Sequence, residues 1–153
     1  MALGDTYVTE ISMEVFSHAT EEPGKVLKAL FSMIPAHFRS KVEVKEEAVR
    51  GHFKNPIIIY RAKLSGRQEV LDTFSLLVQE VSDDDKARLG REIERRIDDS
   101  GKLYLRFDKQ AAYNGAMSVR QDDDTIKLVL RFSGYTSKRD RIRDACREMG
   151  LIP

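Results

Sequence analysis

The stretch GKLYLRFDKQAAYNG, residues 101–115, contains a strand that ends abruptly in polar residues. Apolar side chains alternate with Tyr and Arg over Leu103–Phe107, and this period of two predicts a half-buried strand. The alternation stops at Asp108, which Lys109 and Gln110 follow. Two donor-bearing side chains just past a strand end suit contact with an anion or with bases. Asp108 itself can cap a short helical turn, with Lys109 partly covering that turn.

The composition indicates one soluble domain over residues 1–153, with 41% apolar and 33% charged residues. No apolar run approaches the roughly 18 residues that a membrane span needs, so no membrane partner is expected. The N-terminus lacks the basic region and apolar core of a signal peptide. Cys146 is the only cysteine. An intrachain disulfide is therefore excluded, and a reducing, cytoplasmic location is expected.

The net charge of +1 conceals an alternation along the chain. Residues 1–35 carry a net charge of −3, residues 36–79 of +3, residues 80–100 of −3 and residues 101–153 of +4. A nucleic-acid-binding protein needs a local positive patch and not a high overall pI. The alternation permits such a patch without proving one.

The remaining elements follow from hydrophobic periodicity and capping residues. We predict four further strands, which are Tyr7–Phe16, Lys41–Val49, Ile57–Leu64 and Thr125–Phe132. We also predict four helices. The first ends at Pro35, and the other three begin after the capping residues Ser65, Ser82 and Ser137. Met117–Arg120 is predicted as a short strand that forms a hairpin with Thr125–Phe132 through the QDDD turn. The order is βαββααβββα. It predicts an α+β fold of two layers, with a largely antiparallel or mixed sheet and helices packed on one face.

The other face of this sheet is then open. By the alternation of side chains along a strand, one aromatic and six basic residues project from it: Arg61, Lys63, Tyr104, Arg106, Arg120, Lys127 and Arg131. Such cations can neutralise phosphates, and Tyr104 can stack on a base. Two alternatives stay open. The face can be a solvated one whose cations pair with Glu10 and Glu14, or it can be a protein interface.

Two more polar clusters are candidates for RNA contact. The turn GHFKNP brings together His52, Lys54 and Asn55. Asn55 can equally have a structural role, because Asn tolerates an unusual backbone angle in a turn. The last helix carries several Lys and Arg residues with carboxylates within i,i+4 reach, as on a salt-bridged, solvated face.

Metal binding and catalysis find little support, and we expect no cofactor. His18, His37 and His52 lack the close spacing of metal ligands. The acidic runs Asp83–Asp85 and Asp122–Asp124 are typical of a helix N-terminus and of a turn. No phosphate-binding loop, dinucleotide-binding or nucleophile-elbow motif is present. Cys146 falls on the apolar side of its helix and is expected in the core. A hydrolytic enzyme is the least favoured class.

Three segments carry a family resemblance. RFDKQAA at Arg106–Ala112, HATEEPGKVLKALFSMIP at His18–Pro35 and GHFKNPI at Gly51–Ile57 together resemble an archaeal family of small RNA-binding proteins proposed to be associated with the exosome. The family is similar in fold to the large-subunit ribosomal protein that binds the small rRNA. The resemblance implies an α+β sheet platform and an RNA partner, with exosome or other RNA-processing proteins as further partners.

The sequence therefore predicts a non-catalytic RNA-binding protein that acts as an accessory factor in RNA processing or ribosome-linked metabolism. The basic sheet face and the DKQ segment, Asp108–Gln110, would contact phosphates. The alternative is a protein–protein adaptor whose open face, with Ile57, Ile59 and Val129 among the charges, docks a complex subunit or a second copy.

Overall fold

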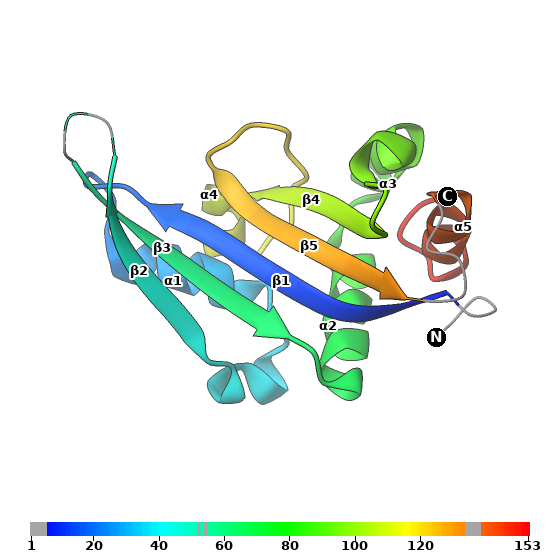
Figure 1. Cartoon of the computed structure of the whole chain (residues 1–153), viewed down its shortest axis with the longest axis horizontal. Helices are drawn as coiled ribbons and strands as arrows, with labels where there is room; N and C mark the ends of the chain where they lie inside the picture. The colour runs from blue at the N-terminus through cyan, green and yellow to red at the C-terminus, as the bar shows by residue number, and fades with distance from the viewer. Residues whose placement is uncertain (1–5, 52, 54, 134–138) are drawn as a thin grey trace.

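The computed structural model describes residues 6–51, 53, 55–133 and 139–153. Its framework is a five-stranded sheet in which every neighbouring pair is antiparallel, in the order β2-β3-β1-β5-β4. The strands are β1 (Tyr7–Ser17), β2 (Val44–Arg50), β3 (Pro56–Leu64), β4 (Lys102–Asp108) and β5 (Thr125–Ser133). β1, the first strand of the chain, lies at the centre of the sheet (Figure 1).

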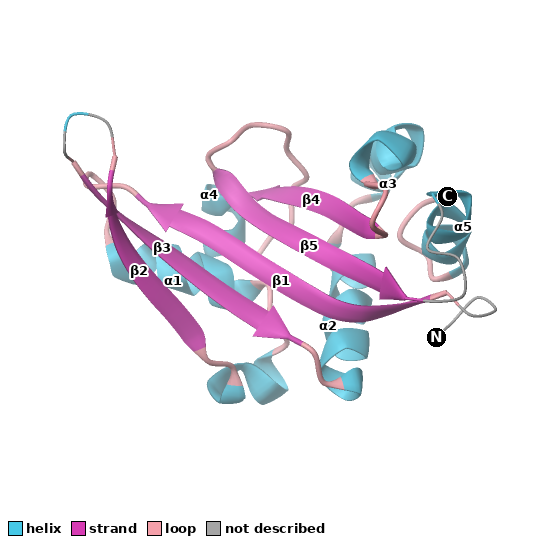
Figure 2. Cartoon of the chain, in the orientation of Figure 1, coloured by secondary structure: helices cyan, strands magenta, loops and turns pink. Residues whose placement is uncertain are grey.

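The helices form a second layer on one side of the sheet. α1 and α2 lie behind the strands in Figure 2, whereas α3 and α5 lie near the β4 side. The helical elements are α1 (Pro23–Ser32), η1 (Ala36–Lys41), α2 (Arg67–Glu80), α3 (Asp83–Glu92), η3 (Ile93–Arg96), α4 (Lys109–Tyr113) and α5 (Arg139–Glu148). The predicted α+β class, with helices packed on one face of an antiparallel sheet, is confirmed. Among the described residues, no helix is long and apolar enough to cross a membrane.

The core lies between these layers and contains every second residue of the strands. Ile11, Met13 and Val15 of β1 are buried, as are Leu103, Leu105 and Phe107 of β4 and the alternate residues of β5 from Ile126 to Phe132. The predicted inward faces are therefore correct. Because directly paired residues of an antiparallel ladder share a face, the intervening residues of all five strands project together from the uncovered side.

The segment Met117–Arg120 differs from the prediction. It does not form a hairpin with β5. Val119 makes an isolated bridge with Phe107 of β4, and Met117 makes one with Val81. β5 is inserted between β1 and β4, so the segment is left to run along the outer edge of β4. The segment is strand-like, as its alternation predicted, but the predicted pairing with β5 is wrong.

The helix starts agree in part with the predicted caps. Ser82 caps α3 by accepting a hydrogen bond from the Asp85 backbone N–H at 3.1 Å. At α2 the N-cap is Gly66, one residue after the predicted Ser65. Ser137, the cap predicted for the last helix, lies outside the described residues. At the end of β4, Asp108 accepts from the Ala111 backbone N–H at 2.8 Å and starts α4 directly.

Candidate nucleic-acid interface

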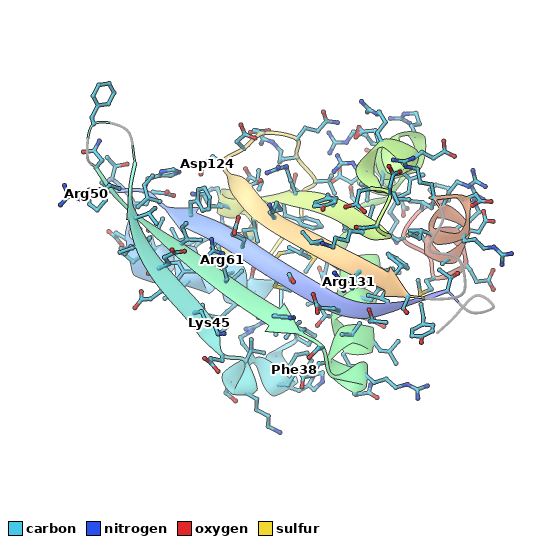
Figure 3. The ribbon with its side chains drawn as sticks, in the orientation of Figure 1. Phe38, Lys45, Arg50, Arg61, Asp124 and Arg131 are labelled. Carbon is cyan, nitrogen blue, oxygen red and sulfur yellow. The ribbon has the colours of Figure 1, made fainter. Side chains whose placement is uncertain are left out.

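The uncovered side of the sheet, here called the open face, is rich in charge. It presents seven basic and four acidic strand side chains: Lys45, Arg61, Lys63, Lys102, Arg106, Lys127 and Arg131, and Glu10, Glu14, Glu47 and Asp108. Arg61 and Arg131 lie over β3 and β5 on this side (Figure 3). The excess of positive charge therefore comes from the sheet itself and not from a flexible tail.

One row of this face crosses all five strands, from β2 to β4, in the order Lys45, Arg61, Glu14, Lys127, Arg106. Like charges are directly opposite each other at both ends of the row, where Lys45 faces Arg61 and Arg106 faces Lys127. Directly opposed like charges destabilise a sheet. Glu14 is the one carboxylate that belongs to the row itself.

Glu14 pairs with the inner cations of the row. Its carboxylate lies 2.9 Å from Arg61 Nε and 3.9 Å from Lys127 Nζ. Arg61 also bonds Glu47 at 2.7 Å, and these hydrogen bonds to Glu47 and Glu14 raise the pKa of Arg61. Lys63 lies 3.4 Å from Glu10. The predicted pairing of Glu10 and Glu14 with cations of this face is present, but it involves only three of the seven cations.

Four cations of the open face have no side-chain partner among the residues that the structure describes. Within the described part of the chain, the side chains of Lys45, Lys102, Arg106 and Arg131 form no ion pair or hydrogen bond. The sequence analysis did not identify Lys45 and Lys102 as residues of this face. Alternation along β4 puts Lys102 on the same face as Tyr104, two residues later, and the pairing of β2 with β3 puts Lys45 opposite Arg61.

A groove of about 540 Å³ lies at the centre of this face. Ser12 and Val129, which are opposite each other on β1 and β5, form part of its lining. Its charged lining has four cations and two carboxylates, which are Lys45, Arg61, Lys63, Lys127, Glu14 and Glu43. The groove therefore carries an excess of positive charge.

Tyr104 is held at the β4 side of the open face. Its hydroxyl donates to Asp98 at 2.9 Å, and this hydrogen bond, with partial burial, raises the pKa of Tyr104. Asp98 also accepts from Ser100 and from the Lys102 backbone N–H. Desolvation raises the pKa of Asp98, but these hydrogen bonds outweigh it and lower the pKa to about 2. Tyr104 is therefore part of a fixed network.

Arg120 lies at the outer edge of β4, beside the open face. Its backbone N–H donates to the Arg106 carbonyl at 2.8 Å. Its guanidinium lies 2.8 Å from Asp122 and 3.4 Å from Asp108, so its charge is largely compensated. The hydrogen bond with Asp122 raises the pKa of Arg120.

Lys109 lies below the surface, with 11% of its side chain exposed. Its ammonium donates to the Phe16 carbonyl and to Glu21, both at 2.9 Å, and lies 2.7 Å from Asp124. These contacts join the end of β1, the segment before α1 and the loop before β5. They use all three ammonium donors, so Lys109 has no donor left for a phosphate. The neighbouring Gln110 is exposed on α4.

β2 and β3 are joined by the turn at residues 51–55, of which 51, 53 and 55 are described. Asn55 is exposed, and its carbonyl accepts from the Gly51 N–H at 2.8 Å. The unusual backbone angle expected at Asn55 occurs at Phe53, whose φ is 59° and whose side chain is 95% exposed. His52 and Lys54, the other predicted contacts of this turn, lie outside the described residues.

Among the described residues, one group has metal-ligand geometry. His18, Glu21 and Asp124 place one ligand atom each within 4.8 Å of the others. Lys109 already supplies a positive charge between the two carboxylates. Partial burial raises the pKa of Asp124, but the hydrogen bonds with Lys109 and His18 outweigh it and lower that pKa. The ammonium thus occupies the position that a cation would take.

The remaining candidates have structural surroundings. Arg143 of α5 pairs with Glu94 at 2.8 Å and with Asp144 at 3.2 Å, which is the predicted salt-bridged helix face. Cys146 is fully buried, and burial raises its pKa to about 12. The prediction that this cysteine belongs to the core is confirmed.

The fold and this surface together define an α+β protein with helices on one side of an antiparallel sheet and a basic, uncovered surface on the other. A sequence profile described as RNA binding matches residues 10–132, and the chain belongs to this family. RNA-binding protein PAB1135 of Pyrococcus abyssi is 32% identical over 146 residues, which are 95% of either chain. Uncharacterized protein MJ0213 of Methanocaldococcus jannaschii is 32% identical over 150 residues, 94% of this chain and 99% of its own.

A solved structure has the same fold. Mth689, a DUF54 protein from Methanothermobacter thermautotrophicus, matches with a TM-score of 0.78 at 26% identity, over 94% of this chain and 98% of its own. The predicted family of RNA-binding proteins with archaeal members is therefore confirmed. The link to the exosome and the similarity to a ribosomal protein stay predictions.

Proposed function

We propose that the chain binds RNA through its open face, by contacts between basic side chains and phosphate groups. The observation that carries the proposal is the row that crosses the sheet, in which four cations surround Glu14. Membership of the RNA-binding family supports RNA as the polyanion.

The dimensions of the row favour a polymer over a small anion. Neighbouring strands lie about 4.8 Å apart, so a row over five strands extends about 19 Å. That length accommodates several consecutive phosphates. The exposed or partly exposed aromatic groups of the strands on this face are few, namely Tyr7, Phe16 and Tyr104. Recognition therefore relies on the backbone and shape of the RNA more than on stacked bases.

The same arrangement supports a non-catalytic role. Catalysis of RNA cleavage needs a metal ion, a general base or a nucleophile beside the phosphate. Within the described residues, the His18 group is neutralised by Lys109, and Cys146 is buried. The protein would act as an accessory factor in RNA processing or ribosome-linked metabolism, and its contacts to processing proteins are part of the proposal.

A protein adaptor is the second candidate, and one observation favours it. The open face becomes apolar toward the β2–β3 turn, where Val49 is opposite Ile57 and Phe16 is opposite Ile59. Phe16 is 39% exposed. Ile59 is buried at 8% exposure, so docking would involve Phe16, Val49 and Ile57. Such docking would depend weakly on salt, whereas binding to phosphates weakens steeply as salt rises. Salt dependence therefore separates the two functions.

The experiment is a fluorescence-anisotropy titration of one structured and one single-stranded RNA at two salt concentrations. The wild type is compared with Arg106→Gln/Lys127→Gln and with the matched control Lys28→Gln/Arg67→Gln. The control removes two exposed cations from α1 and α2, on the helical side of the sheet. All variants are checked for folding by circular dichroism.

We expect salt-sensitive binding by the wild type, a loss of about tenfold or more in the open-face variant, and a much smaller loss in the control. Equal losses in both variants would remove the open face as the site and leave only unspecific charge attraction. An absence of binding to both RNAs at low salt would overturn RNA binding and favour the adaptor.

A further inference from the structure

A second basic pocket, of about 500 Å³, lies between η3 and β4, next to the open face. Four arginines line it and come from three separate elements: Arg95 and Arg96 of η3, Arg106 of β4 and Arg139 of α5. Arg106 is also the last residue of the row that crosses the sheet. The pocket therefore continues the open face beyond its β4 edge.

Two of the arginines hold the walls of this pocket. Arg96, with 11% of its side chain exposed, donates to Glu92 from Nε and Nη2 at 3.3 and 3.0 Å and to the Tyr104 carbonyl at 3.4 Å. Arg139 donates to the Ile97 carbonyl at 2.9 Å and pairs with Asp99 at 3.0 Å. These bonds fix η3 and α5 relative to β4.

The other two arginines have spare donors. The guanidinium of Arg106 forms no hydrogen bond or ion pair with any residue that the structure describes, and its opposite neighbour is Lys127. The side chain of Arg95 is 74% exposed, and its one ionic contact within the described residues is with Glu92 at 3.7 Å. Two guanidinium groups with free N–H donors at one pocket suit the oxygens of a phosphate, which arginine binds in a bidentate manner.

Two carboxylates, Glu92 and Asp98, also line the pocket against four arginines, and their oxygens already accept hydrogen bonds from other groups. Glu92 accepts two bonds from Arg96 and also two from the Gln121 amide, at 2.8 and 2.6 Å. Asp98 accepts bonds from Ser100, from the Lys102 backbone and from the Tyr104 hydroxyl. The four arginines outnumber the two carboxylates, so the lining keeps an excess of positive charge for a ligand.

We propose that the pocket between η3 and β4 binds one phosphate group of an RNA whose chain lies across the open face. Arg95 and Arg106 contact its oxygens, and Arg96 and Arg139 position the walls. This inference rests on the proposed function and extends it to a defined subsite. The phosphate has two possible sources, an internal backbone phosphate or the 5′-terminal phosphate of the RNA.

The test uses the full chain with Arg95→Gln, and with Arg91→Gln as the matched control. Arg91 is an exposed arginine in the last turn of α3 and does not line the pocket. Each protein is titrated with one RNA sequence carrying either a 5′-phosphate or a 5′-hydroxyl group. Because Arg95 is exposed, we expect Arg95→Gln to fold as the wild type does, and thermal denaturation checks this.

We expect Arg95→Gln to weaken binding about tenfold, and Arg91→Gln to change it little. A loss that is equal for both RNAs identifies an internal phosphate, and a loss confined to the 5′-phosphorylated RNA identifies the terminal one. If Arg95→Gln binds both RNAs as well as the control while Arg106→Gln/Lys127→Gln does not, the pocket is overturned and the open face stands. If the wild type binds neither RNA, both proposals are overturned.

Discussion

Arg106 of β4 and Lys127 of β5 lie directly opposite each other in the antiparallel ladder, on the uncovered side of the sheet. Two like charges in this position oppose folding, by an amount of the order of 0.2–1 kcal/mol. Their juxtaposition is favourable only when an anion lies over both. Removal of one of these charges should therefore stabilise the sheet and weaken the binding of its ligand.

The first prediction separates these two effects at one residue. Arg106→Gln should raise the free energy of unfolding by a few tenths of a kcal/mol, up to about 1 kcal/mol, because it removes the repulsion from Lys127. The same change should weaken RNA binding and reduce by about one the slope of log K against log salt concentration. Urea denaturation and anisotropy measure the two quantities. A variant that is less stable than the wild type would show that the guanidinium supports the fold.

The second prediction is a gain of affinity. Glu14 is the one carboxylate in the row. Glu14→Gln should free Lys127 and remove one of the two partners of Arg61, which keeps Glu47, and it should tighten RNA binding by about three- to tenfold. Loss of the Glu14 carboxylate should lower the free energy of unfolding by about 0.5–1 kcal/mol, as for other partly exposed ion pairs. Glu80→Gln, an exposed position on α2, is the control. Equal affinity of Glu14→Gln and wild type would argue against phosphates above this row.

The third prediction concerns Lys109. Lys109→Met should lower the free energy of unfolding by about 1–3 kcal/mol, since Glu21 and Asp124 lose their shared cation while they remain partly desolvated. RNA affinity per folded molecule should stay close to that of the wild type. Gln110→Met, at the exposed neighbouring position, should change stability little. A stable Lys109→Met variant that no longer binds RNA would return Lys109 to the interface.

The fourth prediction is a dependence of stability on pH through Asp98. Its folded-state pKa of about 2 lies below the ordinary value of 3.8. Its contribution is therefore complete above about pH 4 and is lost as the pH falls toward 2. Asp98→Asn should be less stable than the wild type by roughly 1–2 kcal/mol at neutral pH, after allowance for solvent screening. This difference should shrink toward zero at acidic pH.

The measurement for Asp98 is urea denaturation at a series of pH values from neutral to strongly acidic. Asp123→Asn, in the exposed loop before β5, provides the control and should follow the wild type throughout. If the curves of Asp98→Asn and wild type run parallel down to the lowest pH, the hydrogen bonds from Tyr104 and Ser100 do not stabilise the ionised carboxylate.

Local patterns were sufficient to predict the faces of the strands. Leu103–Phe107 alternates cleanly, and burial of alternate residues follows from that period alone. The Asp108 cap was also predictable, because Asp at a strand end commonly accepts from backbone N–H groups two or three residues later. Each of these inferences needs only residues that are neighbours in the chain.

Contacts between distant segments were not predictable in this way. Lys109 reaches Phe16 and Glu21, which are 93 and 88 positions away, so nothing near Lys109 in the chain indicates its surroundings. Val119 lies in a segment with the correct alternation, yet its partner is Phe107 and not a residue of β5. Alternation identifies a strand-like segment but not the strand beside it, because pairing depends on how the whole sheet closes.

The central position of β1 also has a consequence for protein synthesis. β1 leaves the ribosome first, and β3 can pair with only one of its edges. The other edge pairs with β5, which is synthesised much later; Thr9 and Arg131, for example, are 122 positions apart in the chain. Until then the nascent chain exposes an unpaired strand edge, which is a template for association with other chains. Completion of the sheet therefore requires synthesis of β5, and fragments that end before β5 should fail to fold.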